Sequence, residues 1–298
     1  MAGITNKYRL PLIVIVGPTA SGKTGVSIRL AKEIGGEVIS ADSRAIYRGL
    51  DIGTAKPSIE ERQGIPHWGT DIADPGDRFT AVDFKRYAEQ KISEIRARGH
   101  VPILVGGTGL YVDSIVYDFQ FSEESNDVHR RLYFEQFDID WLHKYCEQNN
   151  VKIPENRFNK RYVVNNIIRN GHDLKRMSRP IADCVIVGIT TEKTVLRQRI
   201  HDRAQTMFDG NIVGEAVKAA DKFGWDNEAM TGNIYPLVRR MLAGEITKEA
   251  AIELFEILDW HLAKRQLTWF RRSPDIVWKS LDDVYTHLMQ ELVDVFNS

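Results

Sequence analysis

The feature that most constrains this chain is a glycine-rich turn between an apolar segment and an amphipathic one. Residues 17–24 read Gly-Pro-Thr-Ala-Ser-Gly-Lys-Thr and fit the pattern G-x-x-x-x-G-K-[ST]. Leu12–Val16, just before the turn, is entirely apolar, as in a strand that is covered on both faces. After the turn, Val26, Leu30 and Ile34 recur at helical spacing. This order of strand, turn and helix is the context that the pattern requires, and it predicts a phosphate-binding P-loop.

The residue types in this turn suit the capture of an anion. Glycines let backbone N–H groups surround phosphate oxygens, and the N-terminus of the following helix adds its dipole. Lys23 supplies a positive charge, and the hydroxyl of Thr24 is a suitable ligand for Mg²⁺. The predicted phosphate-binding residues are Gly17, Thr19, Ala20, Ser21, Gly22, Lys23 and Thr24. The pattern alone leaves open which phosphate compound binds.

Segments with strand and helix patterns alternate along most of the chain. Further strands are expected at Glu37–Ala41, Val101–Val105, Cys184–Val187 and Ile276–Trp278. Helices are expected at Ala81–Arg98 and at about 192–208, 212–223, 247–271 and 281–296. The alternation predicts an α/β fold, with a P-loop NTPase-like parallel sheet flanked by helices.

One long segment interrupts this alternation. Ser122–Pro180 has no strong strand signal and has a helical pattern, so we expect a small helical insertion domain at 122–180 between two parts of the P-loop core, 1–121 and 181–298. The distal part of the insertion is basic. Residues 157–179 contain one acid, Asp173, and seven basic residues: Arg157, Lys160, Arg161, Arg169, Lys175, Arg176 and Arg179. The net charge of −1 for the whole chain therefore hides a local positive patch.

The composition excludes several classes of protein. Hydrophobic residues make up 43% and charged residues 27%, which is typical of a globular protein and not of a disordered one. The two cysteines, Cys146 and Cys184, cannot form a disulfide scaffold or a cysteine-rich zinc site. No apolar run approaches the roughly 20 residues that span a bilayer. We therefore expect a soluble cytoplasmic protein without a membrane partner.

Two polar residues follow predicted strands at the edge where such sheets bind ligands. Asp42 comes just after Glu37–Ala41, and Thr108 follows Val101–Val105 within a Gly-Gly-Thr-Gly turn. Asp42 could be a general base, a Mg²⁺ ligand or the N-cap of the following turn. The glycines around Thr108 indicate close approach of the backbone to a ligand. Together the two residues favour a reaction site beside the P-loop.

Short motifs elsewhere in the chain complete this pattern. They are Ile39–Tyr47, Leu50–Pro57, Asp74–Pro75, Ala81–Phe84, Val105–Tyr111 and Ala263–Arg271. With the P-loop, their order and spacing resemble the tRNA dimethylallyltransferase (isopentenyl-tRNA transferase) family over residues 12–117 and about 190–272. The Leu50–Pro57 block is specific to this resemblance, because we can derive no role for it in generic P-loop kinases.

The resemblance implies a reaction. A dimethylallyl group would pass from dimethylallyl diphosphate to the N6 amine of the adenosine 3′ to the anticodon in tRNA, with release of diphosphate. The P-loop and Arg203 would hold the diphosphate, with Lys23 and a Mg²⁺ ion on Thr24 neutralising its charge. As catalytic residues, Asp42 would accept the proton of the amine and Thr108 would orient it.

The resemblance also implies an RNA-binding surface that meets the anticodon loop. Its predicted members are Asp42, Ser43, Arg44, Ala45, Lys160, Arg161, Lys264, Arg265, Gln266, Trp269 and Arg271. Ala45 departs from the family, most of whose members carry Gln there. At 100° per residue, Arg265 and Trp269 fall on the same stripe of their helix as Leu258. This position predicts that both side chains point inward and that Arg265 has an anionic partner. The alternative is that the helix end only extends its charges into solvent.

Other functions fit part of the pattern. The P-loop and a cluster of Arg197, Arg199 and Arg203 would also suit a small-molecule or nucleotide kinase. A relative that uses free AMP or ATP as acceptor would not need the basic segments, and an RNA-binding P-loop protein without enzymatic activity would not need Asp42. We expect a monomeric transferase with Mg²⁺ as its only cofactor.

Overall fold

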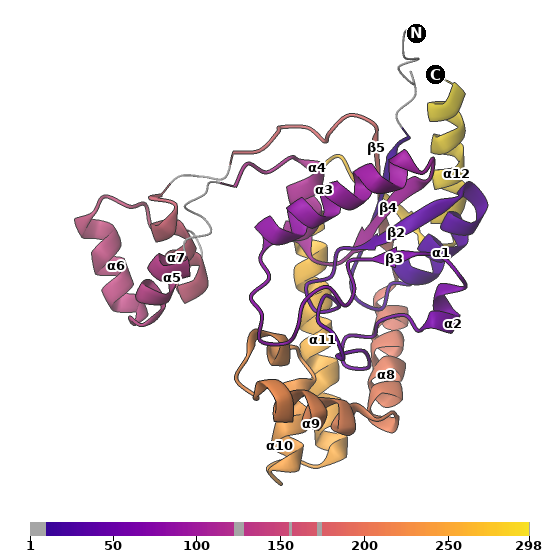
Figure 1. Cartoon of the computed structure of the whole chain (residues 1–298). Coiled ribbons are helices and arrows are strands. Elements are labelled where there is room, and N and C mark those ends of the chain that lie inside the picture. The colour runs from indigo at the N-terminus through magenta and orange to yellow at the C-terminus, as the bar shows by residue number, and fades with distance from the viewer. Residues whose placement is uncertain (1–9, 122–127, 155–156, 172–174, 298) are drawn as a thin grey trace. The chain divides into compact units, whose positions relative to one another are not determined.

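The computed structural model describes residues 10–121, 128–154, 157–171 and 175–297. The chain divides into two compact units, drawn in Figure 1. The first unit joins Met1–Val116 with Arg179–Ser298, and the second is Tyr117–Ser178. The second unit begins and ends a few residues before the insertion that is expected at 122–180.

The centre of the first unit is a six-stranded parallel sheet of order β3-β2-β4-β1-β5-β6. The strands are β1 (Leu12–Val16), β2 (Gly36–Ser40), β3 (His67–Trp68), β4 (Val101–Gly106), β5 (Cys184–Thr190) and β6 (Val277–Ser280). All five strands expected from the sequence are present, with shifts of one to three residues at some ends. The two-residue β3 was not foreseen. The prediction of an α/β parallel sheet is confirmed.

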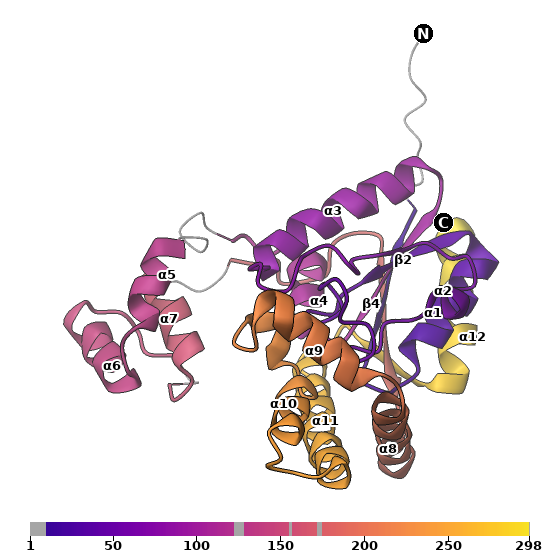
Figure 2. The ribbon, with the colours of Figure 1, turned by 60° about the horizontal axis from the view of Figure 1, so that its bottom comes forward.

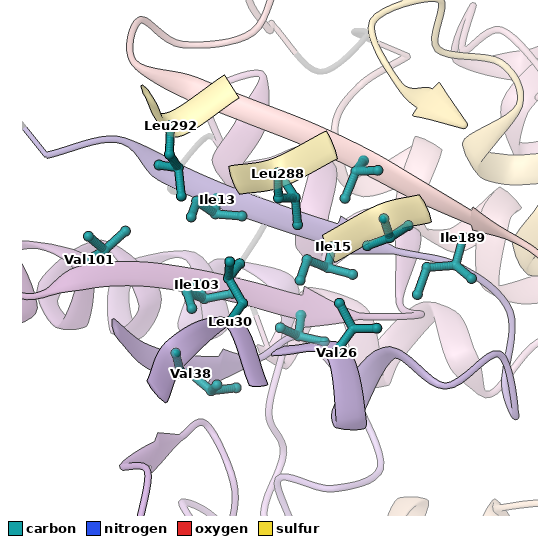
Figure 3. Packing of buried hydrophobic residues seen from close by; sticks show 14 residues of the cluster. Ile13, Ile15, Val26, Leu30, Val38, Val101, Ile103, Ile189, Leu288 and Leu292 are labelled. Atoms are coloured by element: carbon teal, nitrogen blue, oxygen red, sulfur yellow. The ribbon is translucent and has the colours of Figure 1, made fainter. Parts of the chain in front are cut away.

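One face of the sheet packs against α1 (Lys23–Ile34) and α12 (Leu281–Asn297). Alternate strand residues such as Ile13, Ile15 and Ile103 meet Leu30 of α1 and Leu288 of α12 in this layer, shown in Figure 3. The apolar run of β1 is wholly buried because the other face is covered as well. Burial on both faces fixes the strand that leads into the P-loop.

The other face carries α3 (Ala81–Ala97) and α4 (Gly109–Val116). Helix α3 begins with a capping box: the Thr80 side chain accepts from the Asp83 N–H, and the Asp83 carboxylate accepts from the Thr80 N–H. Phe84 of α3 stacks on Tyr111 of α4, with ring centroids 4.1 Å apart. These contacts hold α4, and with it the turn that precedes α4, against the sheet.

The remaining helices of this unit gather beyond one edge of the sheet in both views (Figures 1 and 2). They are α8 (Lys193–Asp209), α9 (Ile212–Phe223), the 3₁₀ turn η2 (Glu228–Thr231), α10 (Tyr235–Leu242) and α11 (Lys248–Phe270). The short α2 (Ile59–Arg62), between β2 and β3 in the chain, is drawn apart from them, near α1. None of the described helices, including the 23-residue α11, is long and apolar enough to cross a membrane.

The second unit is helical in its described part. Its helices are α5 (Val128–Glu135), α6 (Ile139–Gln148) and α7 (Lys160–Ile168). Leu142, Val163 and Ile167 are fully buried in a core of its own. Phe137 stacks on Trp141 with ring centroids 3.7 Å apart, next to this core.

Candidate active site

The P-loop runs from the end of β1 to the first turn of α1, and its lysine folds back over it. The Lys23 ammonium donates to the carbonyl oxygens of Gly17 at 3.0 Å and Pro18 at 2.7 Å. Burial lowers the pKa of Lys23 to about 8; the charge of Asp42 opposes this shift and the charge of Arg203 adds to it. Asp42 and Arg203 are therefore close enough to act on the lysine electrostatically.

Arg203 of α8 and Asp259 of α11 meet at the same loop. An Nη1 hydrogen of Arg203 goes to the hydroxyl of Thr19, and this hydroxyl donates to Asp259 Oδ2 at 3.4 Å. Arg203 Nη1 also lies 3.9 Å from Asp259 Oδ2, while the Asn233 amide donates to Oδ1 at 3.0 Å. The arginine predicted to bind diphosphate thus lies at the P-loop, beside a carboxylate that is almost fully buried.

The other P-loop residues differ in how open they are. Thr24 is exposed at the start of α1, whereas Ser21 is fully buried and its hydroxyl finds no hydrogen-bond partner among the described residues. Ala20 has a left-handed backbone with φ of 60° and packs against the cluster of Leu196, Ile200 and Ala263. The Thr19 N–H donates to Gln266 Oε1 at 2.7 Å, so this N–H is already engaged by α11.

The donors available for a metal ion are few. No group of three His, Cys, Asp or Glu side chains that could hold a metal occurs in the described ranges. The exposed Thr24 hydroxyl and the Asp42 carboxylate are oxygen donors at this edge. Mg²⁺ takes one or two protein oxygens and completes its shell with water and substrate phosphate oxygens, so this donor set fits Mg²⁺ and does not fit zinc.

Asp42 and Thr108 lie on neighbouring turns that are joined by hydrogen bonds. Asp42 Oδ1 accepts from the N–H of Arg44 at 2.8 Å and of Ala45 at 3.4 Å. The Ser43 N–H donates to the Thr108 hydroxyl at 3.0 Å, and the Thr108 N–H donates to the Ala41 carbonyl at 3.1 Å. Asp42 therefore caps its own turn through Oδ1, while Oδ2 makes no hydrogen bond to any side chain or backbone group in the described part of the chain.

The glycines around Thr108 make close contacts with the protein. A Cβ on Gly107 would lie 2.3 Å from Gln266 Nε2, and one on Gly109 would lie 2.2 Å from Trp269 Cδ1. The Trp269 indole N–H donates to the Asp113 carboxylate at 2.9 Å. Two of these glycines therefore allow the Thr108 turn to lie close against α11.

The residues predicted to contact tRNA fall into three groups. Arg44 is partly buried and donates to the Glu228 carbonyl at 2.7 Å, while Ala45 is buried. Gln266 and Trp269 face the P-loop and the Thr108 turn, whereas the exposed cations of this helix end are Lys264, Arg265 and Arg271. Lys160 belongs to the second unit and donates to the Glu135 carbonyl at 2.6 Å. Arg161 follows it in α7, and its side chain lies outside the described structure.

The inward stripe predicted for α11 is wrong in part. Arg265 is exposed and Leu258 is 37% exposed, whereas Trp269 is partly buried as expected. The buried residues of α11 are instead Ala251, Ile252, Phe255, Asp259, Ala263 and Phe270. The stripe was misplaced because α11 packs against α4, α8 and α10 and so has no single apolar face.

Sequence reasoning missed two polar residues of the site, Asp259 and Asn233. Asp259 follows the buried Phe255 by four residues, so the correct helical stripe would have marked it as a buried carboxylate. Asn233 precedes α10 in a segment without a recognisable motif. No signal in the sequence points to it.

The parallel sheet, the P-loop after β1 and the lysine folded over that loop define a P-loop NTPase-like protein. A sequence model of the family described as IPP transferase matches residues 45–273, and one described as isopentenyl transferase matches residues 10–68. The chain therefore belongs to the IPP transferase family.

Individual relatives agree with this assignment. The chain is 37% identical to the tRNA dimethylallyltransferase of Bacillus cytotoxicus over 93% of its own length and 92% of the relative. It is 34% identical to the tRNA isopentenylpyrophosphate transferase of Bacillus halodurans, whose structure it matches with a TM-score of 0.74 over 96% of this chain and 98% of that one. A eukaryotic dimethylallyltransferase acting on tRNA, 23% identical over 91% of this chain and 74% of that one, shares the fold with a TM-score of 0.75.

Proposed function

We propose that this protein transfers a dimethylallyl group from dimethylallyl diphosphate to the N6 amine of the adenosine 3′ to the anticodon in tRNA, and releases diphosphate. The observation that carries the proposal is that the turns of Asp42 and Thr108 are hydrogen-bonded to each other at the carboxyl ends of β2 and β4, on the same side of the sheet as the P-loop that follows β1. A base and a cation for a leaving group therefore share one edge of the sheet. The names of the relatives support the same substrates.

The P-loop side of the site suits the diphosphate. Lys23 and Arg203 supply two positive charges, and the start of α1 adds its dipole. Because Lys23 is held back on the carbonyls of Gly17 and Pro18, a bound diphosphate would compete for it as an ionic partner. These groups would stabilise the charge that grows on the bridging oxygen as the C–O bond breaks.

A magnesium ion would be held by the Thr24 hydroxyl together with diphosphate oxygens, since Mg²⁺ keeps most of its shell as water and substrate oxygens and needs few protein donors. When bound, it would add further positive charge to the leaving group.

The other side of the site suits the adenosine. The exocyclic amine is a weak nucleophile because its lone pair is delocalised into the ring. As the N–C bond forms and the C–O bond breaks, the amine must lose a proton, and Asp42 Oδ2 is the free carboxylate oxygen that would take it. The Thr108 hydroxyl, bonded to the turn of Asp42 through Ser43, would accept the other N–H of the amine and orient it.

The exposed cations would meet the RNA. Lys264, Arg265 and Arg271 at the end of α11 belong to the same unit as the site, and the basic helix α7 belongs to the helical insertion. Positive charge interleaved with aromatic residues suits single-stranded loops whose bases are unstacked. A monomeric cytoplasmic enzyme, with 122–180 as its RNA-binding insertion, is consistent with these features.

Labelled dimethylallyl diphosphate, incubated with unmodified tRNA and the protein, tests the proposal. We expect label in the RNA, no requirement for ATP and no transfer by the Lys23→Met variant. A P-loop kinase would instead consume ATP, phosphorylate a small acceptor and leave the RNA unlabelled.

A further inference from the structure

The Leu50–Pro57 block is held by one carboxylate from a distant part of the chain. Glu215, in the first turn of α9, accepts from three consecutive backbone N–H groups: Asp51 at 2.7 Å and Ile52 at 2.7 Å through Oε2, and Gly53 at 2.9 Å through Oε1. Consecutive N–H groups that converge on one anion form a nest, which is a strong and directional arrangement. The loop after β2 lies against α9 in both Figures 1 and 2.

A tyrosine completes the arrangement. The Tyr235 hydroxyl, at the start of α10, donates to Glu215 Oε1 at 2.9 Å. Tyr235 is almost fully buried, and burial, followed by the charge of Glu215, raises its pKa above the usual range, so it keeps the proton that it donates. A Cβ on Gly53 would lie 2.5 Å from the Tyr235 hydroxyl oxygen, so only glycine lets this loop reach the carboxylate. We call Glu215, Tyr235 and the N–H groups of residues 51–53 the clasp.

The block held by the clasp is tied in turn to the segment that carries Asp42. Lys56 donates from one ammonium to the Tyr47 carbonyl and to the carboxylates of Asp51 and Asp71, and its side chain is 2% exposed. Tyr47 is buried, and its N–H bonds the Arg44 carbonyl in the turn that Asp42 caps. Hydrogen bonds thus run without a break from Glu215 to the turn of the proposed base.

A second contact joins that turn to the same helical segment. Arg44 Nη1 donates to the Glu228 carbonyl in η2, between α9 and α10. The clasp and this contact hold the 42–57 segment against residues 215–235 at two places. The P-loop is linked to this helical segment by a different route, through Asn233 and Asp259.

We propose that Glu215 is a positioning residue for the acceptor side of the site: by clamping residues 51–53 it fixes the turn that aims the Asp42 carboxylate, and it does so without contributing to diphosphate binding. The inference rests on the proposed function. This role for Glu215 also explains the Leu50–Pro57 block, which supplies the three N–H groups that bind the Glu215 carboxylate.

The Glu215→Gln variant tests this role. Gln keeps the size of the side chain but loses the charge and one of the two acceptor oxygens that the three N–H groups and Tyr235 share. Because hydrogen bonds to a charged group are the stronger ones, we expect kcat for transfer to fall about tenfold to a hundredfold. The KM for tRNA should rise, while the affinity for inorganic diphosphate, measured by calorimetry, stays at the wild-type value.

Two further variants make the experiment decisive. Tyr235→Phe removes a single bond to Glu215 and should lower kcat by less, again without a change in diphosphate affinity. Glu253→Gln changes an exposed glutamate of α11 and should behave as wild type. If Glu215→Gln does not fold, Tyr235→Phe alone carries the test through the same separation of transfer from diphosphate binding.

The outcomes separate this inference from the proposed function. Wild-type protein that fails to label tRNA contradicts the proposed function. Wild-type protein that labels tRNA, with a Glu215→Gln variant of unchanged kcat and tRNA KM, overturns the inference alone. A parallel loss of diphosphate affinity and transfer in folded Glu215→Gln or Tyr235→Phe also overturns it, because the clasp would then support the whole site.

Discussion

Two charged side chains at opposite ends of the parallel strands, Glu37 and Lys23, differ in whether neighbouring charged groups pair with them. Glu37 lies near the amino end of β2, where its side chain is 3% exposed. Its carboxylate accepts from Arg98 at 2.8 and 3.0 Å and from Trp68 at 2.6 Å, and it lies 2.7 Å from His100 Nδ1. Burial alone would raise the pKa of Glu37, but the bonds from Arg98, His100 and Trp68 outweigh it and lower the pKa to about 2.

Lys23, at the carboxyl end of β1, is in the opposite situation. In the described part of the chain it makes no ion pair and donates only to two carbonyl groups of its own loop. Burial therefore prevails and lowers its pKa to about 8. A charge that pairs with neighbouring groups, like that of Glu37, therefore serves the fold, whereas the Lys23 charge, without an ionic partner, is available for a ligand.

The largest expected effect comes from the carboxylate beside that unmatched lysine. Asp42→Asn keeps the size of the side chain but cannot take a proton, so transfer should fall by about 10²–10⁴-fold. Binding of tRNA and of diphosphate, measured separately, should stay close to wild type. If Asp42 were a Mg²⁺ ligand instead, the variant would lose diphosphate affinity and excess Mg²⁺ would partly restore the rate.

Glu37, the paired charge at the amino end of β2, should affect stability. Glu37→Gln should lower the free energy of unfolding at pH 7 by about 3 kcal/mol, because the pKa of Glu37 falls from 4.5 to about 2 on folding and each pKa unit corresponds to about 1.4 kcal/mol. Because the folded-state pKa is the lower one, this contribution is complete above about pH 4.5 and is lost as the pH falls towards 2.

Denaturant unfolding across this pH range measures the Glu37 effect. The wild-type and Glu37→Gln curves should converge in acid, and Glu33→Gln, an exposed glutamate of α1, should match wild type throughout. A constant difference down to pH 2 would contradict the assignment.

The unmatched lysine should make diphosphate binding depend on pH. Since the pKa of Lys23 is lowered to about 8, the free protein loses this cation above pH 8, and diphosphate affinity should fall by up to about tenfold for each further pH unit. Calorimetry in two buffers with different ionisation enthalpies should detect proton uptake on binding near pH 8. The Lys23→Met variant should bind weakly and take up no proton at this pH, and uptake equal to that of wild type would assign the proton to another group.

The smallest effect is expected in the helical insertion. Replacing Lys160 and Arg161 by alanine should weaken tRNA binding and flatten its salt dependence by about 0.7 in log–log slope for each lost phosphate contact. Binding assays over a salt series measure the slope, with the exposed Lys32→Ala of α1 as control. An unchanged slope would mean that this helix only faces solvent.

The sequence predicted the parts of the molecule that depend on local pattern. Three local patterns lie within the 23 residues from Leu12 to Ile34: the apolar run of β1, the glycine-rich turn and the helical period of α1. Each of these patterns predicts the element that its own residues form. The predicted contact of Arg203 with the P-loop came from resemblance to a family, because nothing in the α8 sequence indicates which loop it meets.

Contacts between distant residues could not be predicted in this way. The bonds that Thr19 makes with Asp259 and Gln266 span 240 and 247 residues. Resemblance to the family implied that Gln266 contacts tRNA, but no pattern in the sequence indicated the bond that its Oε1 accepts from the Thr19 N–H. The two-residue β3 was missed because its pairing partner β2, and not its own sequence, makes it a strand.

A single-turnover experiment with two variants separates two roles of charge. Charges without an ionic partner at the carboxyl ends of the strands should perform the chemistry, and the paired charges at the amino ends should stabilise the fold. Labelled dimethylallyl transfer to tRNA is followed at a temperature where the wild type, Asp42→Asn and Glu37→Gln are all folded. We expect a wild-type rate for Glu37→Gln and a rate lower by about 10²–10⁴-fold for Asp42→Asn, with no rescue by Mg²⁺. Equal loss of transfer in both variants, or recovery of Asp42→Asn with added Mg²⁺, would contradict this separation of roles.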